Sequence, residues 1–335
     1  METRKTIETM NNKYQSVPMT FDPAECFFPQ KHIVNSWFFI GRVNVEDHEL
    51  AFLFHLMTGT IKSAGFINTV VSILEKNTGF YKSKDSVAKT LSTSKIKDKK
   101  LNMKTGFAMM QGSFEEAIVL KAELDDCALA VKVDPVGNVI YNGGTGFFPL
   151  LQNKQNYQYS CPEMRMEGSF TIQGTEYKFK NGDCWFDRQW NSPDIKEAKN
   201  LKNWDPKWMW MGIKLDNGKS ISLWEILPEN GQHFTFVTIL HEDGHQTVSH
   251  VPSVVENADQ CWHSDITNQN YPTHWILSIP DFNAKLEVLC DPAHQEIVSE
   301  VKTLNKYEAE SRVTGIYDGN KVTGSCCVEL LGSWK

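Results

Sequence analysis

The sequence is dominated by short apolar runs that alternate with a period of two and are separated by turn residues. "SWFFIGRVNV" at 36–45 precedes "ELAFLFHLM" at 49–57, and "WMWMGIKLDNGKSISLWEIL" at 208–227 holds two such runs around an Asp-Asn-Gly turn. This is the period of a strand, whose side chains alternate between the two faces of a sheet. Sustained helical periodicity is confined to short connectors. The pattern therefore predicts an all-β protein built from antiparallel hairpins.

The length predicts two β domains. A chain of 335 residues is long for one domain, and the polar segment 191–207, which contains two prolines, interrupts the strand pattern. We expect two antiparallel β-barrels or sandwiches with few helices, at 25–195 and 196–335. The Lys-rich segment 84–100 is expected to be a mobile surface insertion, and Asn181-Gly182 to be a turn between two short strands.

Charge and composition exclude several classes of partner. The net charge is −7 and no long basic run occurs, which disfavours nucleic acid and anionic membrane surfaces as partners. No apolar run is long enough to span a membrane, and the polar N-terminus shows no signal peptide, so we expect a cytoplasmic protein. The eight cysteines form no CxxC pair and are interpreted as reduced thiols, mostly in the core.

The sequence "HEDGH" at 241–245 matches the H-E-x-x-H pattern of zinc proteases. That chemistry requires a helix, on which histidines four residues apart share a face. Here the preceding "FTFVTIL" alternates as a strand, and Asp243-Gly244 is a typical hairpin turn. We therefore interpret the motif as a turn. The sequence predicts no metal site, and because it has no glycine-rich phosphate loop followed by a helix, it predicts no cofactor either.

The stretch "CWFDRQW" at 184–190 places charged residues among aromatic ones. Alternation puts Trp185, Asp187 and Gln189 on one face of a strand and Arg188 on the other. Arg188 is thus expected to tie strands together rather than to pair with Asp187. Asp187 is either a carboxylate bound to backbone groups or an acid in an apolar cavity, where desolvation raises its pKa and makes it a proton donor. The residues alone leave these two readings open.

Several stretches together indicate a family. "KHIVNSWFFIGRV", "CWFDRQW", "WMWMGIKLDNGKSISLWEIL", "YPTHWILSIPDFNAKLEV" and "VTGSCCVELLG" occur in this order between His32 and Leu331. They resemble the lipocalin-like family of carotenoid 1,2-hydratase, kievitone hydratase and bacterial proteins labelled secreted hydrolases, and more distantly the fungal decalin-forming cyclases. The resemblance implies two lipocalin-like β domains. It also implies that Asp187 is the proton donor to an alkene, and that Trp185 matches an aromatic position of the family motif.

The resulting hypothesis is an enzyme that acts on a carbon–carbon double bond of a hydrophobic, isoprenoid- or polyketide-like small molecule, most simply by hydration. Protonation by Asp187 would give a carbocation, which aromatic faces stabilise. The candidate substrate-binding residues are Trp185, Gln189, Trp37, Trp210, Tyr159 and Tyr271. Core packing is the commoner role for residues such as Trp210. Two alternatives stay open: an intramolecular cyclase that works by proximity, and a non-catalytic carrier of an apolar ligand.

Overall fold

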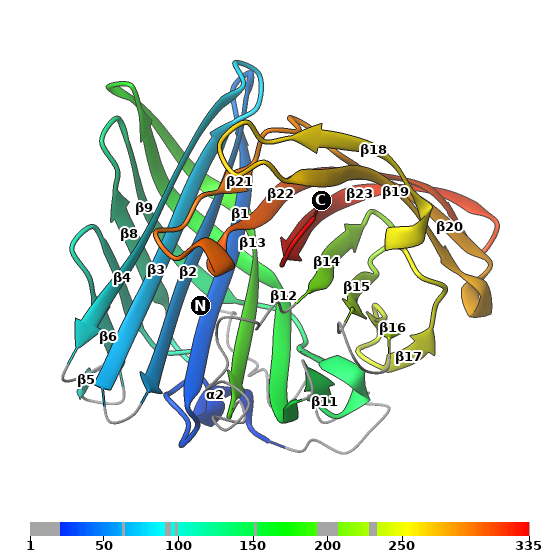
Figure 1. The fold of residues 1–335 in the computed structure, drawn as a ribbon, viewed down its shortest axis with the longest axis horizontal. Coiled ribbons are helices and arrows are strands. Elements are labelled where there is room, and N and C mark those ends of the chain that lie inside the picture. Colours follow the sequence, from blue (N-terminus) through cyan, green and yellow to red (C-terminus); the bar gives the residue numbers. More distant parts are fainter. Residues whose placement is uncertain are drawn as a thin grey trace. The chain divides into compact units, whose positions relative to one another are not determined.

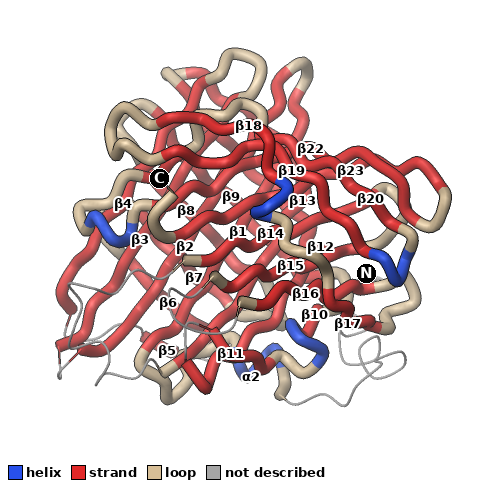
Figure 2. The backbone as a smooth tube through the Cα atoms, turned by 45° about the vertical axis from the view of Figure 1, so that its right-hand side comes forward, coloured by secondary structure: helices blue, strands red, loops and turns tan. Residues whose placement is uncertain are grey.

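A computed structural model of the chain describes residues 21–61, 64–90, 95–97, 100–150, 153–192, 207–227 and 233–334. Within these ranges nearly all regular structure is strand, and every helix has only three or four residues (Figure 2). Neighbouring strands pair in antiparallel fashion with registers that continue over many residues. The predicted all-β fold with few helices is therefore confirmed.

The chain forms two compact units. Among the described residues, the first contains 21–139 and 157–192, and the second contains 140–156 and 207–334. The second unit thus includes 140–156, a segment that lies in the sequence between the two parts of the first unit. The predicted boundary at 195/196 falls on 193–206, outside the described residues, and it stays a prediction.

The first unit is built on a sheet whose described strands follow the order β4-β3-β2-β1-β13-β12-β9-β8-β7-β6-β5 (Figure 1, blue to green). Off this path, β10 and β11 pair with β12; both lie, with the first residues of β12, in the segment 140–156 of the second unit. The elements of this sheet and the helical turn before it are α2 (Pro23–Cys26), β1 (Val34–Val45), β2 (His48–Ile61), β3 (Ala64–Glu75), β4 (Phe80–Thr90), β5 (Lys95–Lys97), β6 (Lys100–Lys104), β7 (Ala108–Gly112), β8 (Ile118–Glu123), β9 (Cys127–Pro135), β10 (Ile140–Tyr141), β11 (Phe147–Leu150), β12 (Asn153–Ile172) and β13 (Thr175–Asn191).

Contacts across this sheet show that it curls upon itself. Lys82 on β4 is 3.7 Å from a carboxylate oxygen of Asp126, in the turn between β8 and β9. Lys84, also on β4, lies over the ring of Phe107, just before β7, at 5.0 Å. These strands are far apart in the strand order, so the sheet must bend to bring them together. One face of the curled sheet is packed with aromatic rings; Phe39 and Phe186, for example, stack with centroids 4.4 Å apart.

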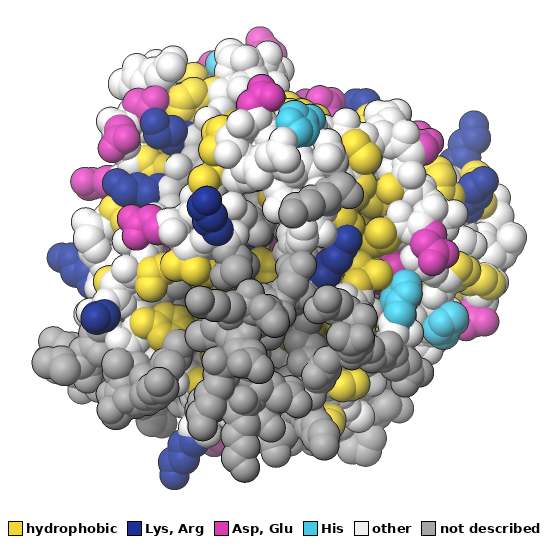
Figure 3. Space-filling model, in the orientation of Figure 1, with side chains coloured by type: hydrophobic (Ala, Val, Ile, Leu, Met, Phe, Trp, Pro, Cys, Tyr) yellow, Lys and Arg dark blue, Asp and Glu magenta, His cyan; other side chains and the backbone are white. Residues whose placement is uncertain are grey.

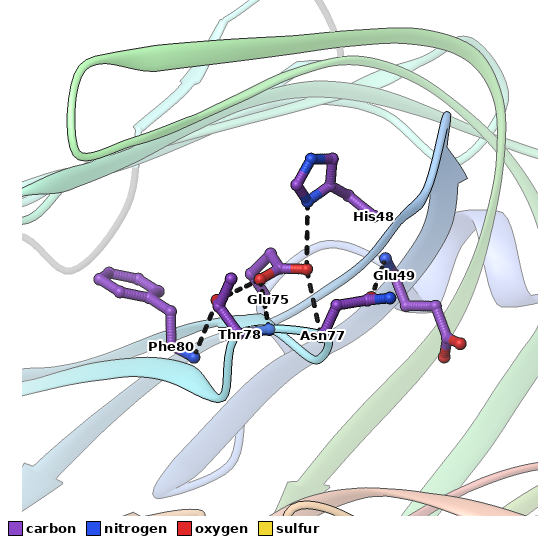
Figure 4. Close-up of polar contacts among 6 residues, drawn as sticks. All are labelled: His48, Glu49, Glu75, Asn77, Thr78 and Phe80. Atoms are coloured by element: carbon purple, nitrogen blue, oxygen red, sulfur yellow. Dashed lines mark hydrogen bonds and ion pairs between the residues drawn. The ribbon is translucent and has the colours of Figure 1, made fainter.

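The turn between β3 and β4 is held by a buried carboxylate (Figure 4). Glu75, only 2% exposed, accepts hydrogen bonds from the backbone N–H groups of Asn77 at 3.2 Å and Thr78 at 2.8 Å. The hydroxyl of Thr78 also donates to it, and His48 Nδ1 lies 3.3 Å from Oε1. Burial alone raises the pKa of Glu75, but these hydrogen bonds outweigh it, and the net direction is downward. The carboxylate therefore closes the Asn-Thr-Gly turn at 77–79.

Two local predictions for this unit are wrong. Residues 84–90, expected in a mobile insertion, belong to β4 and pair with β3, and 95–97 form β5; 91–94 and 98–99 lie outside the described residues. Gly182 does not mark a turn, because β13 runs through it. A Cβ at Gly182 would come within 2.5 Å of Met166, so glycine permits close packing here rather than chain reversal.

The second unit contains a sheet whose described strands follow the order β17-β16-β15-β14-β23-β22-β20-β19-β18, with β21 paired to β22. The elements are η1 (Asn142–Gly144), β14 (Trp208–Leu215), β15 (Ser220–Ile226), β16 (Phe234–Leu240), β17 (Gln246–His250), η3 (Val255–Asn257), β18 (Ala258–His263), β19 (Asn270–Ile279), η4 (Pro280–Phe282), β20 (Ala284–Cys290), β21 (Glu296–Ile297), η5 (Lys302–Leu304), β22 (Lys306–Tyr317) and β23 (Asn320–Leu331).

One face of this second sheet encloses an apolar core. Met209, Leu223, Val237, Trp275 and Val328, on five different strands, are all fully buried there. The "HEDGH" stretch forms the turn between β16 and β17, closed by a hydrogen bond from the backbone N–H of residue 241 to the carbonyl of residue 245, as predicted. The imidazoles of these two residues stack nearly in parallel, with their centroids 3.9 Å apart.

The described surface is of mixed charge. On the face drawn in Figure 3, acidic and basic side chains are interspersed. All eight cysteines lie in the described ranges and are reduced, and only Cys261 is exposed. Within the described ranges, no helix combines the length and the apolar character needed to cross a bilayer.

Candidate active site on strand β13

The candidate site is built around Asp187, which is buried near the C-terminal end of β13. The indole N–H of Trp185 donates a hydrogen bond to its Oδ1 at 2.7 Å, and the amide of Gln158 donates to its Oδ2 at 3.1 Å. Ser160 contributes a further side-chain hydrogen bond. Trp185 is two residues away on the same strand, and the other two residues lie on β12. Two adjacent strands therefore hold the carboxyl group from both sides.

The protonation of Asp187 is set by its burial. Desolvation raises the pKa of the carboxyl from 3.8 to about 7, although the hydrogen bonds from Ser160, Trp185 and Gln158 act in the opposite direction. A carboxyl group with a pKa near 7 is protonated in about half of the molecules at neutral pH, and it can then donate a proton. This environment fits the proton-donor interpretation of Asp187 better than that of a permanently ionised carboxylate.

Asp187 belongs to a row of side chains that crosses the sheet on one face. Asp187 pairs with Phe38 on β1, and Phe38 pairs with His55 on β2. Directly paired residues of an antiparallel sheet point to the same side. The imidazole of His55 packs edge-on against Phe38, with centroids 5.3 Å apart, and its Nε2 lies 2.7 Å from Ser36 Oγ. The Asp187 face thus combines an acid, an imidazole and aromatic rings.

Arg188 points to the opposite face, as alternation predicts. It is completely buried, and its guanidinium lies 4.2 Å from the ring of Trp37 and 5.1 Å from that of Trp190. Its N–H groups donate to the carbonyls of residues 26, 27, 28, 36 and 189 and to the amide oxygen of Asn35. Burial lowers the pKa of Arg188 to about 9. Arg188 therefore ties the segment after α2 to β1 and β13, and its hydrogen bonds go to carbonyl and amide oxygens rather than to Asp187.

The predicted residues of the first unit are divided between the two faces. Trp185 contacts Asp187 directly, and Gln189 lies on the same face by alternation and is half-buried. Trp37 lies with Arg188, and its indole N–H donates to the carbonyl of residue 27 at 2.8 Å. Tyr159 packs against Phe186 on that opposite face, and its hydroxyl donates to the carbonyl of residue 23 at 2.8 Å. The structure thus places Trp37 and Tyr159 on the face opposite to Asp187, and their roles as substrate-binding residues stay predictions.

The other two candidates belong to the second unit. Trp210 on β14 is 1% exposed, and its indole N–H donates to Ser222 Oγ at 3.0 Å. Tyr271 on β19 is fully buried in the apolar core, and its hydroxyl donates to Glu296 at 2.9 Å. Both side chains have structural partners within their own unit, and their roles as substrate-binding residues stay predictions.

Sequence reasoning missed the two β12 residues that contact Asp187. It selected Tyr159 from this strand, whereas Gln158 and Ser160, one residue to each side, face Asp187. The signal was the alternation of polar and aromatic residues in "NYQYS" at 156–160. The register between β12 and β13 decides whether the polar or the aromatic residues of this run lie on the Asp187 face. The sequence does not specify that register.

Known proteins are similar to this chain in sequence or in structure. The dehydratase asqC of Emericella nidulans is 26% identical over 202 residues, which are 57% of this chain and 54% of that protein. The chain thus aligns with about half the length of this curated relative. The structure of kievitone hydratase from Nectria haematococca matches with a TM-score of 0.80 at 18% identity, covering 97% of both chains. A structure from Nitrosomonas europaea described as an AttH matches with a TM-score of 0.79 at 18% identity, covering 96% of this chain and 99% of that one.

At 18% identity these two structures show the fold alone. Each shares that fold with this chain over nearly its whole length. The resemblance to the family of kievitone hydratase is thereby confirmed at the level of architecture. A family model matches independently, over residues 62–333, which include the second sheet, the first sheet from β3 onward, and Asp187 with its partners on β12 and β13. The chain therefore belongs to the family described as AttH-like.

Proposed function

We propose that this protein is a hydro-lyase, which adds water to a carbon–carbon double bond of a small molecule or removes water to form one, with Asp187 as the acid. The observation that carries the proposal is the buried carboxyl group of Asp187, whose pKa is raised to about 7 by desolvation. A carrier of an apolar ligand needs no such group. The names of the relatives, a hydratase and a dehydratase, support the same class of reaction.

The surroundings of Asp187 fit protonation of an uncharged substrate. The indole of Trp185 and the ring of Phe38 lie on the Asp187 face. Proton transfer to an alkene leaves a carbocation, and an aromatic face stabilises a cation by roughly 0.5–2 kcal/mol, depending on its desolvation. In the opposite direction, the same acid protonates a departing hydroxyl group. The substrate we propose is a hydrophobic isoprenoid- or polyketide-like molecule, because apolar rings rather than charged groups flank the acid.

The test uses kievitone as the probe, since the relative of the same fold is named for it. The protein is incubated with kievitone in oxygen-18-labelled water, and the products are analysed by mass spectrometry. We expect a product that has gained one labelled water, and we expect Asp187→Asn to abolish its formation. Asp265→Asn, which replaces a fully exposed carboxylate, is the matched control and should retain activity.

The label also separates the alternatives. An isomeric, ring-closed product without labelled oxygen would support the cyclase instead. Tight binding of the probe without any product, together with an Asp187 that titrates near 3.9, would support the carrier. A fully active Asp187→Asn variant would refute the acid role directly.

A further inference from the structure

We propose that the side-chain amide of Gln158 binds the oxygen atom that the reaction adds or removes, as a water before hydration and as a hydroxyl group before dehydration. The inference rests on the proposed function, because it assigns a further residue to the same reaction. It comes from the two ends of this amide: one is bonded to Asp187, and the other has no hydrogen-bond partner among the described residues.

The nitrogen end of the amide is held by Asp187. Nε2 donates a hydrogen bond to Oδ2 at 3.1 Å, and Gln158 is only 2% exposed on β12. An ionised carboxylate can only accept hydrogen bonds, so the amide must turn its nitrogen rather than its oxygen toward Asp187. The other carboxyl oxygen accepts from the indole of Trp185, a group that can only donate. The acid therefore sets the orientation of the Gln158 amide.

The oxygen end of the same amide is a buried acceptor, and no donor of the described residues reaches it. Buried polar groups of native proteins are almost always paired, because an unpaired group costs stability. Two other buried glutamines of the chain follow this rule. Oε1 of Gln246 accepts from the backbone N–H of residue 141 at 2.8 Å. Oε1 of Gln295 accepts from the backbone N–H of residue 310 at 2.9 Å. Gln158 departs from the rule directly beside the candidate acid, so we expect its donor to come from a ligand.

A single oxygen atom can bridge Gln158 and Asp187. The oxygen and nitrogen of an amide are about 2.3 Å apart, so Oε1 lies within about 5.5 Å of Oδ2. Hydrogen bonds between oxygen atoms are about 2.7–2.8 Å long, which allows one oxygen between the two to bond both. A water or a hydroxyl group fits this position, because it donates its hydrogen to Oε1 and accepts the proton of the neutral acid. An alkene carbon can do neither.

In the reaction, Gln158 positions this oxygen while Asp187 exchanges the protons. For hydration, Asp187 gives its proton to one alkene carbon, and the water held by Oε1 bonds through its oxygen to the other. The water then loses a proton to the neighbouring carboxylate, so the acid is restored and one water is added in all. For dehydration, Asp187 protonates the hydroxyl group held by Oε1 as its bond to carbon breaks. The adjacent carbon returns a proton to Asp187, and one water is released.

The first test needs no substrate and asks whether Oε1 is paired in the free protein. Gln158→Met keeps the size of the side chain and removes both polar ends. At pH 5, where Asp187 is neutral in the folded protein, we expect its midpoint of urea unfolding to equal or exceed that of the wild type. The reason is that the loss of one hydrogen bond is offset by removal of an unpaired acceptor.

Gln246→Met is the matched control for this test, because its Oε1 is paired with a backbone N–H group. We expect this variant to unfold at a lower urea concentration than the wild type. An equal loss of stability in Gln158→Met would show that its Oε1 is paired within the folded protein, and it would overturn the inference. A Gln158→Met chain that circular dichroism shows to be unfolded counts as the same result.

The second test is kinetic and uses kievitone and the product of its hydration. We expect Gln158→Met to lower kcat for hydration about 10–10²-fold, because the water is no longer positioned, and to leave the KM of kievitone within about twofold. The inhibition constant of the hydrated product should rise about 10-fold, since its hydroxyl group loses an acceptor. An unchanged inhibition constant would overturn the inference.

Two control variants separate this effect from others. Ser160→Ala also removes a hydrogen bond from Asp187, so it tests the loss of contact with the acid. It should leave the ratio between the inhibition constant of the hydrated product and the KM of kievitone unchanged. Gln111→Met, at an exposed position on β7, should change none of these constants.

The two proposals fail in different ways. If Asp187→Asn loses turnover while Gln158→Met keeps the wild-type kcat and inhibition constant, the role of Gln158 is refuted and the proposed function stands. If the wild type does not convert kievitone, the result counts against the proposed function. The unfolding comparison then decides the inference alone: a stable Gln158→Met supports an acceptor reserved for a ligand, and a loss equal to that of Gln246→Met refutes it.

Discussion

Asp187 should destabilise the folded protein at neutral and alkaline pH, so that Asp187→Asn is more stable than the wild type. Its pKa is about 7 in the folded protein, against an ordinary value of 3.8. Below pH 4 the group is protonated in both the folded and the unfolded state and contributes nothing. Between pH 4 and 7 only the folded state holds the proton, so the free energy of unfolding falls by about 1.4 kcal/mol per pH unit. Above pH 7 both states are ionised, and the loss levels off at about 4 kcal/mol.

The surroundings of Asp187 can accept the amide. Trp185 donates to one carboxyl oxygen and can donate in the same way to the carbonyl oxygen of asparagine. Gln158 donates to the other oxygen, and its own Oε1 is buried without a hydrogen-bond partner. If the Gln158 amide turns over, Oε1 accepts from the new N–H group, and the Gln158 amino group takes the place of Oε1, where it finds no acceptor. An unpaired buried donor costs about 1–3 kcal/mol, so the variant should keep only part of the electrostatic gain of about 4 kcal/mol.

The assay is urea unfolding of the wild type and of Asp187→Asn, followed by tryptophan fluorescence at intervals from pH 4 to 9. The difference between the two free energies of unfolding removes the titration of all other groups. It should grow with pH up to about 7 and then stay constant. Asp265→Asn, at a fully exposed position, is the control for the substitution itself. A difference that does not vary with pH, or a variant less stable than the wild type at pH 8, would refute the argument that burial keeps Asp187 neutral.

Three further predictions concern stability. Arg188→Leu should lower the free energy of unfolding by about 3–5 kcal/mol, because it leaves several buried oxygens without a donor, each at a cost of about 1–3 kcal/mol. Unchanged stability with reduced turnover would instead place Arg188 in the active site. The pKa of His274 is raised, chiefly by its hydrogen bond to Asp259. Its stabilising contribution is therefore present below pH 6.5 and is lost as the pH rises through the raised pKa. His274→Gln should abolish this part of the pH dependence of the melting temperature. The pKa of Glu75 is lowered, so its contribution to the stability of the fold is present above pH 4.5 and is lost on acidification. Glu75→Gln should lower the free energy of unfolding at pH 7 by about 1–3 kcal/mol. Equal stability of the variant and the wild type would show that the turn does not depend on the carboxylate.

Much of the fold could be read from the sequence because it depends on local patterns. Alternation and turn residues lie in contiguous segments, and they correctly predicted the antiparallel strands that contain 36–45 and 49–57 and the turn at 241–245. The same patterning put Arg188 on the face opposite to Asp187. It failed where packing overrides local propensity. Gly182 lies inside β13, where the absence of a side chain leaves room for Met166, and 84–90 extend the sheet by pairing with β3.

The sequence by itself selected Asp187 and Trp185 as candidate site residues and predicted that both lie on one face of a strand. The tertiary structure decided which other side chains meet the carboxyl group. Gln158 and Ser160 rather than Tyr159 face it, and His55 shares its row across β1. The physical reason is register: sliding one strand by a single residue exchanges its two faces, and register is set by the packing of the whole sheet rather than by any one segment. The pKa of Asp187 likewise depends on burial, which no sequence window contains.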